Sequence, residues 1–283
     1  MGFVGIIVIE PCGKKAWARE GGTGMQQMHI FTAGVAIKLV QDTIAQWDRE
    51  HPELPAVMVP GGSVDLIRKC RAGEPCDLLV MADDTIIASM LMPAYTDGYY
   101  IFAGNRMVIT ANAGAQISSG DWQERLLAPD ATFSHFNPYG DPSGYRAVMC
   151  MLLADQVEPG LSQRLMEHPG HYGMDPQMSL QQLPKCQYTF SYYSGAFARQ
   201  TPFAQLPAVM DLSDEALSDV YGTVHFDVDA DNTVTGTPIR HALAIPKNSA
   251  YRAQARAFAE LFLQSDFAGH GFLPRSEAVG NWQ

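Results

Sequence analysis

The sequence lacks the features that mark several large classes of protein. No run of about 18 consecutive apolar residues occurs, which argues against a membrane-spanning helix of ordinary length. Long basic runs are also absent, and 19 Lys and Arg residues stand against 30 Asp and Glu residues, a net charge of −11. Nucleic-acid-binding proteins rely on Lys and Arg to neutralise phosphates, so no nucleic-acid partner is expected. A small anion is not excluded, because helix N-termini hold anions without counter-charges.

The common catalytic and cofactor motifs are missing as well. There is no Gly-x-Ser-x-Gly nucleophile elbow, no Walker loop and no Gly-x-Gly-x-x-Gly fingerprint. The five cysteines include no Cys-x-x-Cys pair, which disfavours a zinc ribbon or a thioredoxin-like site. We therefore expect neither an enzyme nor a cofactor.

Two of the cysteines lie close together in the sequence. Cys70 and Cys76 flank Arg-Ala-Gly-Glu-Pro, which predicts a turn that brings the two thiols together. In an oxidising compartment they would form a disulfide, and the alternative is a pair of buried thiols. Both interpretations stay open from the sequence.

Residues 1–27 are predicted to be a leader or flexible N-terminus. A short apolar run, residues 3–9, is followed by Ala16-Trp17-Ala18, which is similar to a signal-peptide cleavage site. A secretory signal would begin with a basic segment, and no basic residue precedes Phe3. A disordered leader and the remnant of an export signal are both consistent with this pattern.

The remaining chain has an α/β pattern in two lobes. Strands predicted at 29–33, 56–59 and 77–81 are each followed by a helix, which implies a parallel sheet with helices on its faces. Further strands are predicted at 107–110, 132–136 and 187–190, with a hairpin of 220–228 and 233–241. The predicted division is lobe I at 28–106, lobe II at 107–238 and a return to lobe I at 239–283.

Three predicted turns lead from a strand or loop into a helix. They are Thr32-Ala-Gly-Val-Ala36, Pro60-Gly-Gly-Ser-Val64 and Asp141-Pro-Ser-Gly-Tyr-Arg146. Ligands bind at the carboxyl ends of parallel strands, where helix starts offer unpaired N–H groups. We expect the three turns to form an anion site, with Ser63 as a helix N-cap. The acids of Asp227-Val-Asp229-Ala-Asp231 are expected to be solvated in the hairpin.

Six blocks occur in an order that resembles one known family. They are His29-Ile-Phe-Thr-Ala-Gly34, Pro60-Gly-Gly-Ser-Val-Asp-Leu-Ile-Arg-Lys69, Asp77-Leu-Leu-Val-Met-Ala-Asp83, Asn137-Pro-Tyr-Gly-Asp-Pro-Ser-Gly-Tyr-Arg146, Tyr188-Thr-Phe-Ser-Tyr192 and Ile245-Pro-Lys-Asn248. Together they resemble the periplasmic molybdate/tungstate-binding proteins of ABC importers, especially the archaeal-type tungstate-binding branch. The resemblance covers about residues 28–275, and the Asp-Pro-x-Gly-Tyr-Arg element is its most specific part.

This resemblance implies a two-lobed type II periplasmic-binding-protein fold with an oxyanion in the cleft between the lobes. The implied function is a receptor in the periplasm or outside the cell that presents a small oxyanion to an ABC permease, as a monomer and without catalysis. The residues implied to contact the ligand are Gly34, Val35 and Ser63 in the first lobe, and Asp141, Ser143 and Tyr192 in the second.

The sequence departs from the family pattern at two places. Val35 stands where the family commonly has a serine, so a hydroxyl donor is lost. In the tungstate branch two carboxylates complete a six-coordinate metal; Asp141 would be one, but the spacing of the second reaches Met174, with Asp175 beside it. The alternatives are a receptor for sulfate or a carboxylate, and an enzyme using Asp141 and Tyr192 as acid–base groups.

Overall fold

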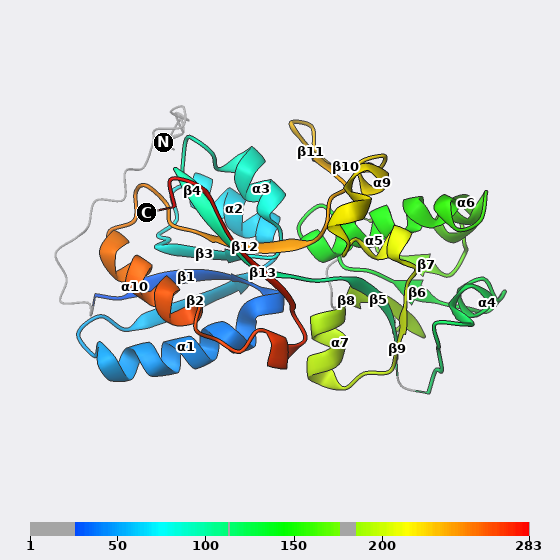
Figure 1. Cartoon of the computed structure of the whole chain (residues 1–283), viewed down its shortest axis with the longest axis horizontal. Helices are drawn as coiled ribbons and strands as arrows, with labels where there is room; N and C mark the ends of the chain where they lie inside the picture. Colours follow the sequence, from blue (N-terminus) through cyan, green and yellow to red (C-terminus); the bar gives the residue numbers. More distant parts are fainter. Residues whose placement is uncertain (1–25, 113, 176–184, 283) are drawn as a thin grey trace, which may run out of the picture.

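The computed structural model describes residues 26–112, 114–175 and 185–282, which form two α/β lobes lying side by side (Figure 1). The first lobe is built on a six-stranded sheet in the order β13-β4-β12-β3-β1-β2. Its elements are β1 (Met28–Ala33), η1 (Gly34–Ala36), α1 (Ile37–Glu50), β2 (Ala56–Gly61), α2 (Ser63–Arg71), β3 (Leu78–Met81), α3 (Asp84–Met90), β4 (Gly98–Gly104), β12 (Arg240–Ala244), α10 (Arg252–Phe262), η5 (Ala268–His270) and β13 (Leu273–Gly280).

The second lobe is built on a five-stranded sheet in the order β7-β6-β8-β5-β9, with a separate β10-β11 hairpin. Its strands are β5 (Met107–Ala111), β6 (Phe133–Ser134), β7 (His171–Tyr172), β8 (Tyr188–Tyr192), β9 (Phe203–Gln205), β10 (His225–Asp229) and β11 (Asn232–Thr235). Its helices are α4 (Trp122–Leu126), α5 (Pro142–Leu152), η2 (Leu153–Gln156), α6 (Leu161–Met166), α7 (Tyr193–Arg199), α8 (Ala208–Asp211), η4 (Glu215–Leu217) and α9 (Ser218–Tyr221).

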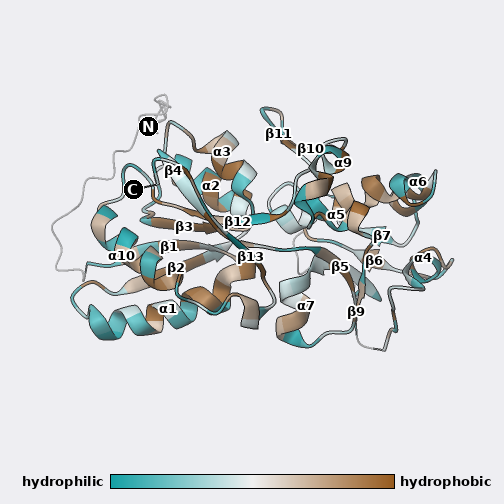
Figure 2. Cartoon of the chain, viewed as in Figure 1, coloured by the Kyte–Doolittle hydropathy of each residue, from teal (hydrophilic) through white to brown (hydrophobic). Residues whose placement is uncertain are grey.

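Buried apolar strands explain why the first sheet forms. The four residues of β3 are all buried, and β1 pairs in parallel with both β2 and β3. Because side chains alternate across a strand, Ile30 packs on the α1 and α10 side while Phe31 packs on the α2 and α3 side. Figure 2 shows the same division, with apolar residues along the central strands and polar residues on the outer helix surfaces.

The chain passes between the lobes at two crossings. Strand β4 ends at Gly104 in the first sheet, and β5 begins at Met107 in the second. After β11, the chain returns as β12, which pairs antiparallel with both β3 and β4. The predicted two-lobed α/β fold is confirmed, with the carboxyl ends of β1 and β3 directed toward the second lobe (Figure 1).

The predicted hairpin and the predicted leader compare differently with the structure. The hairpin exists, but its first strand does not begin at residue 220, because 218–221 form α9 and bury Tyr221 in the core. The predicted second strand, 233–241, is also wrong, because β11 ends at Thr235 and residues 240–241 belong to β12 of the first sheet. The predicted leader lies almost entirely in residues 1–25, outside the described residues. Among the helices of the described residues, none combines the length and the apolar character that crossing a membrane requires.

Candidate ligand-binding site

A cavity of about 370 Å³ lies where the two lobes meet. Five of the eight residues predicted for the site line it, namely Gly34, Val35, Asp141, Ser143 and Tyr192. By contrast, the hollows beside Trp282 and Phe267 are lined from the first lobe alone. The cavity between the lobes is therefore the candidate ligand site.

The first-lobe wall begins where β1 ends. Ala33 closes the strand in an extended conformation, and the chain turns directly into η1 with no side chain capping the helix start. The N–H groups of a helix start have no partner within the helix, so those of Gly34 and Val35 are available to an acceptor. A side chain placed on Gly34 would meet no atom within 4 Å, so glycine here keeps the cavity open.

Ser63 has a different position from the one predicted. It is the first residue of α2, and Gly62 is the N-cap, so the predicted N-cap role of Ser63 is wrong by one residue. The side chain is fully buried, and its Oγ accepts a hydrogen bond from the Ala82 N–H at 2.9 Å. Ala82 lines the cavity whereas Ser63 does not, so this hydroxyl ties α2 to the end of β3 behind the cavity wall.

Asp141 opens the second-lobe wall as the N-cap of α5. Its Oδ1 accepts hydrogen bonds from the Ser143 N–H at 2.8 Å and from the Ser143 hydroxyl at 2.5 Å. Pro142 occupies the first turn, where its missing N–H costs nothing. Burial raises the pKa of Asp141 above its ordinary value of 3.8, although the two bonds from Ser143 oppose that shift. One carboxylate oxygen is thus committed to the helix cap.

Two adjacent hydroxyl groups stand at the end of β8. Ser191 and Tyr192 both line the cavity, and each hydroxyl oxygen is buried without a hydrogen-bond partner among the described residues. Burial raises the pKa of Tyr192 well above its ordinary value, so the phenol keeps its proton and is a donor. Unpaired buried hydroxyls are costly in a folded protein, so these two are the donors that the cavity leaves available. The family resemblance described above predicted Tyr192 as a ligand contact but did not point to Ser191.

Met174 and Asp175 are not among the residues that line the cavity. Met174 packs, partly buried, against the hydrophobic core, and Asp175 is exposed. Gly173 precedes them with a φ of +125°, and a Cβ there would lie 2.7 Å from the His135 carbonyl oxygen, so this turn requires glycine. Within the described ranges, Asp141 is the one carboxylate of the cavity, and a second carboxylate stays a prediction.

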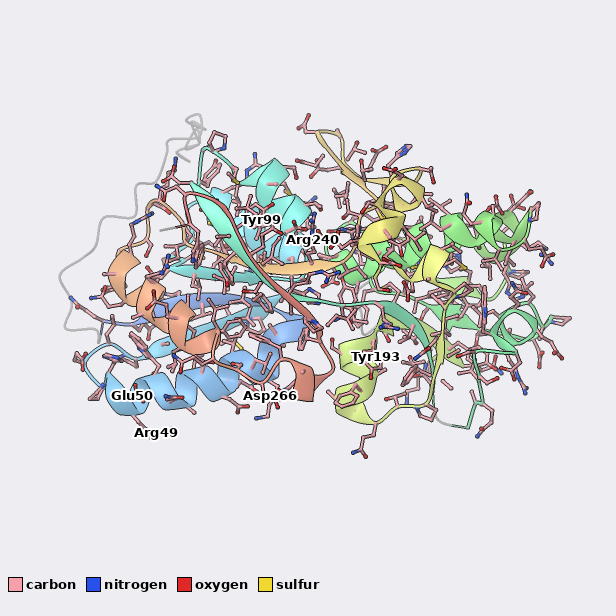
Figure 3. All side chains as sticks on the ribbon, viewed as in Figure 1. Arg49, Glu50, Tyr99, Tyr193, Arg240 and Asp266 are labelled. Atoms are coloured by element: carbon pink, nitrogen blue, oxygen red, sulfur yellow. The ribbon has the colours of Figure 1, made fainter. Side chains whose placement is uncertain are left out.

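Basic groups also line the same cavity. Lys38 on α1, Arg199 on α7 and His270 on η5 all line it. Lys38 forms an ion pair with Asp42, one helical turn further along α1. Figure 3 shows α7, marked by Tyr193, facing the C-terminal segment of the first lobe that carries Asp266. Two cationic side chains, Lys38 and Arg199, therefore line the cavity beside one carboxylate, Asp141, and the charge of Lys38 is offset by Asp42.

Residues 28–272 match the family described as bacterial extracellular solute-binding proteins. The chain belongs to this family. An uncharacterized solute-binding protein of Petrotoga mobilis is 30% identical over 246 residues, which cover 81% of this chain and 76% of the relative. The molybdate/tungstate-binding protein WtpA of Pyrococcus abyssi is 28% identical over 282 residues, covering 86% of this chain and 82% of that protein.

Solved structures have the same fold as this solute-binding protein. The periplasmic molybdate-binding protein of Azotobacter vinelandii matches with a TM-score of 0.65 at 15% identity, covering 88% of this chain and all of the other. The sulfate-binding protein SubI of Mycobacterium tuberculosis matches with a TM-score of 0.58 at 17% identity, covering 88% and 87% of the two chains. At these identities the likeness concerns the fold.

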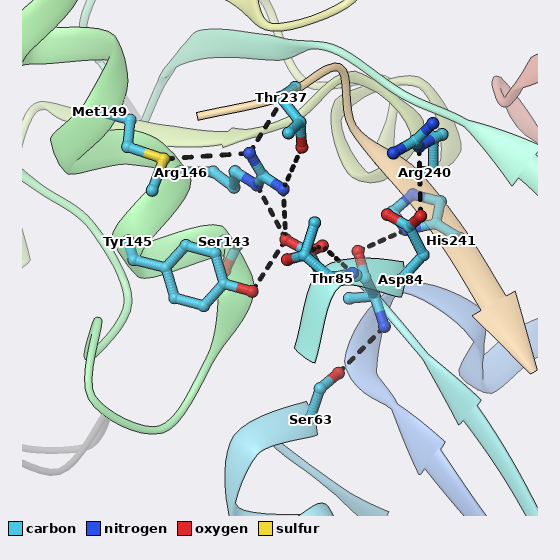
Figure 4. A network of polar contacts seen from close by, with 12 residues as sticks. Ser63, Asp84, Thr85, Ser143, Tyr145, Arg146, Met149, Thr237, Arg240 and His241 are labelled. Atoms are coloured by element: carbon cyan, nitrogen blue, oxygen red, sulfur yellow. Dashed lines mark hydrogen bonds and ion pairs between the residues drawn. The ribbon is translucent and has the colours of Figure 1, made fainter. Parts of the chain in front are cut away.

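A buried ion pair joins the two lobes of this solute-binding protein beside the cavity (Figure 4). Asp83, at the start of α3, lies 2.6 Å from the Arg146 guanidinium of α5, and both side chains are fully buried. The Tyr145 hydroxyl also donates to Asp83, at 2.8 Å, and Arg146 donates to the carbonyl and hydroxyl oxygens of Thr237. The Asp-Pro-x-Gly-Tyr-Arg element thus places its Asp at the cavity and its Tyr-Arg at the junction of the lobes.

A second contact between the lobes lies at the start of α2. The Val64 N–H donates to the Gly140 carbonyl at 3.2 Å, and a Cβ on Gly62 would lie 2.3 Å from that same oxygen. Arg68 donates to the Tyr139 carbonyl at 3.0 Å and to Asp229 Oδ2 at 2.9 Å. The sequence predicted that Asp229 is solvated in the hairpin, and this prediction is wrong because the Asp229 carboxylate pairs with Arg68. The loop that precedes Asp141 is held directly against the first lobe.

Proposed function

We propose that this protein is the receptor for a small oxyanion of the molybdate/tungstate class, which it delivers to the membrane permease of an ABC importer. The proposal places it in the periplasm or at the cell surface, as a monomer that performs no catalysis. The observation that carries it is the pair of buried, unpartnered hydroxyls of Ser191 and Tyr192 in a cavity between two lobes. The 28% identity to a molybdate/tungstate-binding relative supports the ligand class.

The donor set matches the chemistry of an oxyanion. A tetrahedral oxyanion offers acceptors on every side, and the cavity offers hydroxyl donors at the end of β8 and N–H groups at the start of η1. Exclusion of water by the surrounding lobes strengthens each of these bonds, because charge–dipole interactions are stronger at low dielectric. Neutral donors then hold the anion without a buried counter-charge.

Asp141 gives the site its selectivity in this proposal. A carboxylate beside an oxyanion is repulsive unless it is protonated or bonds to the metal centre of the anion. Its oxygen not used for capping is a hard ligand suited to a high-valent oxo metal. Molybdate and tungstate are able to expand their coordination and sulfate is not, so we expect the metal oxyanions to bind more tightly.

We further propose that residues 28–106 with 239–283 move as one body and residues 107–238 as the other. Strands β4, β12 and β13 belong to one sheet, whereas β5, β8 and β9 belong to the other, which supports this division. Opening about the two crossings would let the anion enter. Closure would bring Gly140 and Asp141 against the start of α2, where they lie in this structure.

Calorimetric titration with tungstate, molybdate, sulfate and phosphate tests the proposal. Calorimetry suits this chain better than tryptophan fluorescence, because none of the described tryptophans lines the cavity. We expect saturable binding of one equivalent of tungstate or molybdate. Equal affinity for tungstate and sulfate would refute the role given to Asp141, and no binding of any of the four anions would refute the oxyanion receptor itself.

The rival enzyme hypothesis is tested with the same preparation. Asp141 and Tyr192 line one cavity, but Asp141 is committed to Ser143 and the Tyr192 phenol is held neutral by burial. A receptor returns its ligand chemically unchanged after dialysis. Elemental analysis of the protein as isolated, for molybdenum, tungsten, sulfur and phosphorus, identifies a retained anion directly.

A further inference from the structure

We propose that Cys70 and Cys76 form a disulfide bond in the mature protein, which locks the end of α2 to the beginning of β3. The proposal rests on the position of the two thiols and on membership of an extracellular family, and it does not depend on which ligand is bound. In the structure both residues are free, buried thiols. The proposed bond forms from them by oxidation.

The local backbone brings the two sulfur atoms together. Cys70 lies in the last turn of α2, and Gly73, with a φ of +90°, ends that helix with its N–H bonded to the Cys70 carbonyl. The Glu74 N–H bonds to Lys69, which completes a tight reversal into Cys76. Both cysteines lie in the same buried cluster at the two ends of this turn, and each thiol shifts the pKa of the other.

The two sulfur atoms have complementary chemistry. The neighbouring Cys76 thiol lowers the pKa of Cys70, while burial and the neighbouring Cys70 thiol raise the pKa of Cys76. Cys70 is therefore the thiol that attacks first, since the thiolate is the nucleophile. The five residues between the two cysteines, 71–75, are all exposed, so the buried pair lies beside a solvent-facing turn.

The reaction needs a disulfide oxidant, such as oxidised glutathione. The Cys70 thiolate attacks one glutathione sulfur and releases the other as a thiolate, which leaves a mixed disulfide. The Cys76 thiolate then attacks the Cys70 sulfur and releases the second glutathione. The protein loses two protons and two electrons, and oxidised glutathione takes up both to give two thiols. Extracellular compartments favour the bonded state.

Peptide mapping of the full chain tests the proposal. Trypsin cuts after Lys69, Arg71 and Arg106, so a disulfide attaches the dipeptide Cys70-Arg71 to the peptide 72–106. We treat the protein with oxidised glutathione, block the remaining thiols with iodoacetamide and digest it without reductant. The expected result is the linked species, which disappears on reduction. Separate alkylation of both cysteines, or linkage of either to Cys150 or Cys186, would overturn the proposal.

Thermal unfolding provides the second measurement. Closing a ring of this size restricts the unfolded chain, so the oxidised protein should melt roughly 5–10 °C above the reduced protein. Cys70→Ser should abolish this sensitivity to reductant, and Cys150→Ser, which alters a buried thiol elsewhere, should keep it. Cys70→Ala replaces Cys70→Ser if the serine variant does not fold. Equal melting temperatures of the oxidised and reduced wild type would count against the bond.

Discussion

Replacing Tyr192 with phenylalanine separates ligand binding from folding. The hydroxyl of Tyr192 is buried and has no partner among the described residues, so the unliganded protein gains nothing from it. Tyr192→Phe should therefore leave the free energy of unfolding unchanged, or raise it by up to about 1 kcal/mol, because a buried unpaired group is removed. The bound anion, by contrast, loses a donor that the cavity holds in place.

The expected loss of affinity follows from the charge of the acceptor. A hydrogen bond to a charged group contributes about 1.5–3 kcal/mol, and each 1.4 kcal/mol is a factor of ten in affinity. Tyr192→Phe should therefore raise the dissociation constant of the preferred anion about 10- to 150-fold. The result should hold across neutral pH, because burial raises the pKa of Tyr192 well above that range.

Tyr221→Phe is the matched control. Tyr221 is also fully buried in the second lobe, but its hydroxyl donates to the Ala208 carbonyl at 2.6 Å and lies outside the cavity. This variant should lose about 1 kcal/mol of stability and keep its affinity, the opposite of Tyr192→Phe. Calorimetric titration gives the dissociation constant of each variant, and urea unfolding gives the free energy of unfolding of each. An unchanged dissociation constant in Tyr192→Phe would show that its hydroxyl does not reach the ligand.

Three further predictions concern buried polar groups. Ser63→Ala should lower the free energy of unfolding by about 1–3 kcal/mol in urea titrations, because the Ala82 N–H loses its acceptor; an unaltered midpoint would contradict that bond. Arg146→Met should cost about 3–5 kcal/mol in the same assay, since Asp83 is left as a buried unpaired charge, and a neutral result would mean that water reaches Asp83. His241 is buried, and burial lowers its pKa from 6.5 to about 4. Between these two pH values the unfolded chain binds a proton at His241 and the folded protein does not. Stability should therefore fall as pH drops from about 6.5 to 4, and His241→Gln should reduce that slope; parallel pH profiles would refute the assignment.

Most of the fold could be predicted from the sequence because the patterns that indicate strands and helices are local. Buried apolar runs such as 77–81 predict strands without reference to the rest of the chain, and the structure places β3 at Leu78–Met81. The strand predicted from residue 220 failed because Val220 and Tyr221 are apolar and aromatic, a pattern shared by strands and short helices. Burial of Tyr221 in the core selects the helical turn there, and that contact is not local.

The site was predicted less completely because it is assembled from distant segments. A resemblance identified the positions of Asp141 and Tyr192, but nothing in a single serine at the end of a strand distinguishes Ser191 from any other. Its importance comes from the missing partner of its hydroxyl, which only three-dimensional packing reveals. Ser63 shows the reverse: its motif predicted a ligand contact, and packing gives its hydroxyl an internal partner.

The Asp83–Arg146 pair also constrains how the chain reaches its final structure. Each charge has its counterpart in the other lobe, so the buried pair forms only when both lobes are present and in contact. Strands β12 and β13 complete the first sheet and yet follow the whole second lobe in the sequence. During synthesis the first sheet is therefore completed only after the second lobe has been made. A chain interrupted before β12 would therefore lack two of the six strands of the first sheet as well as the segment that carries them.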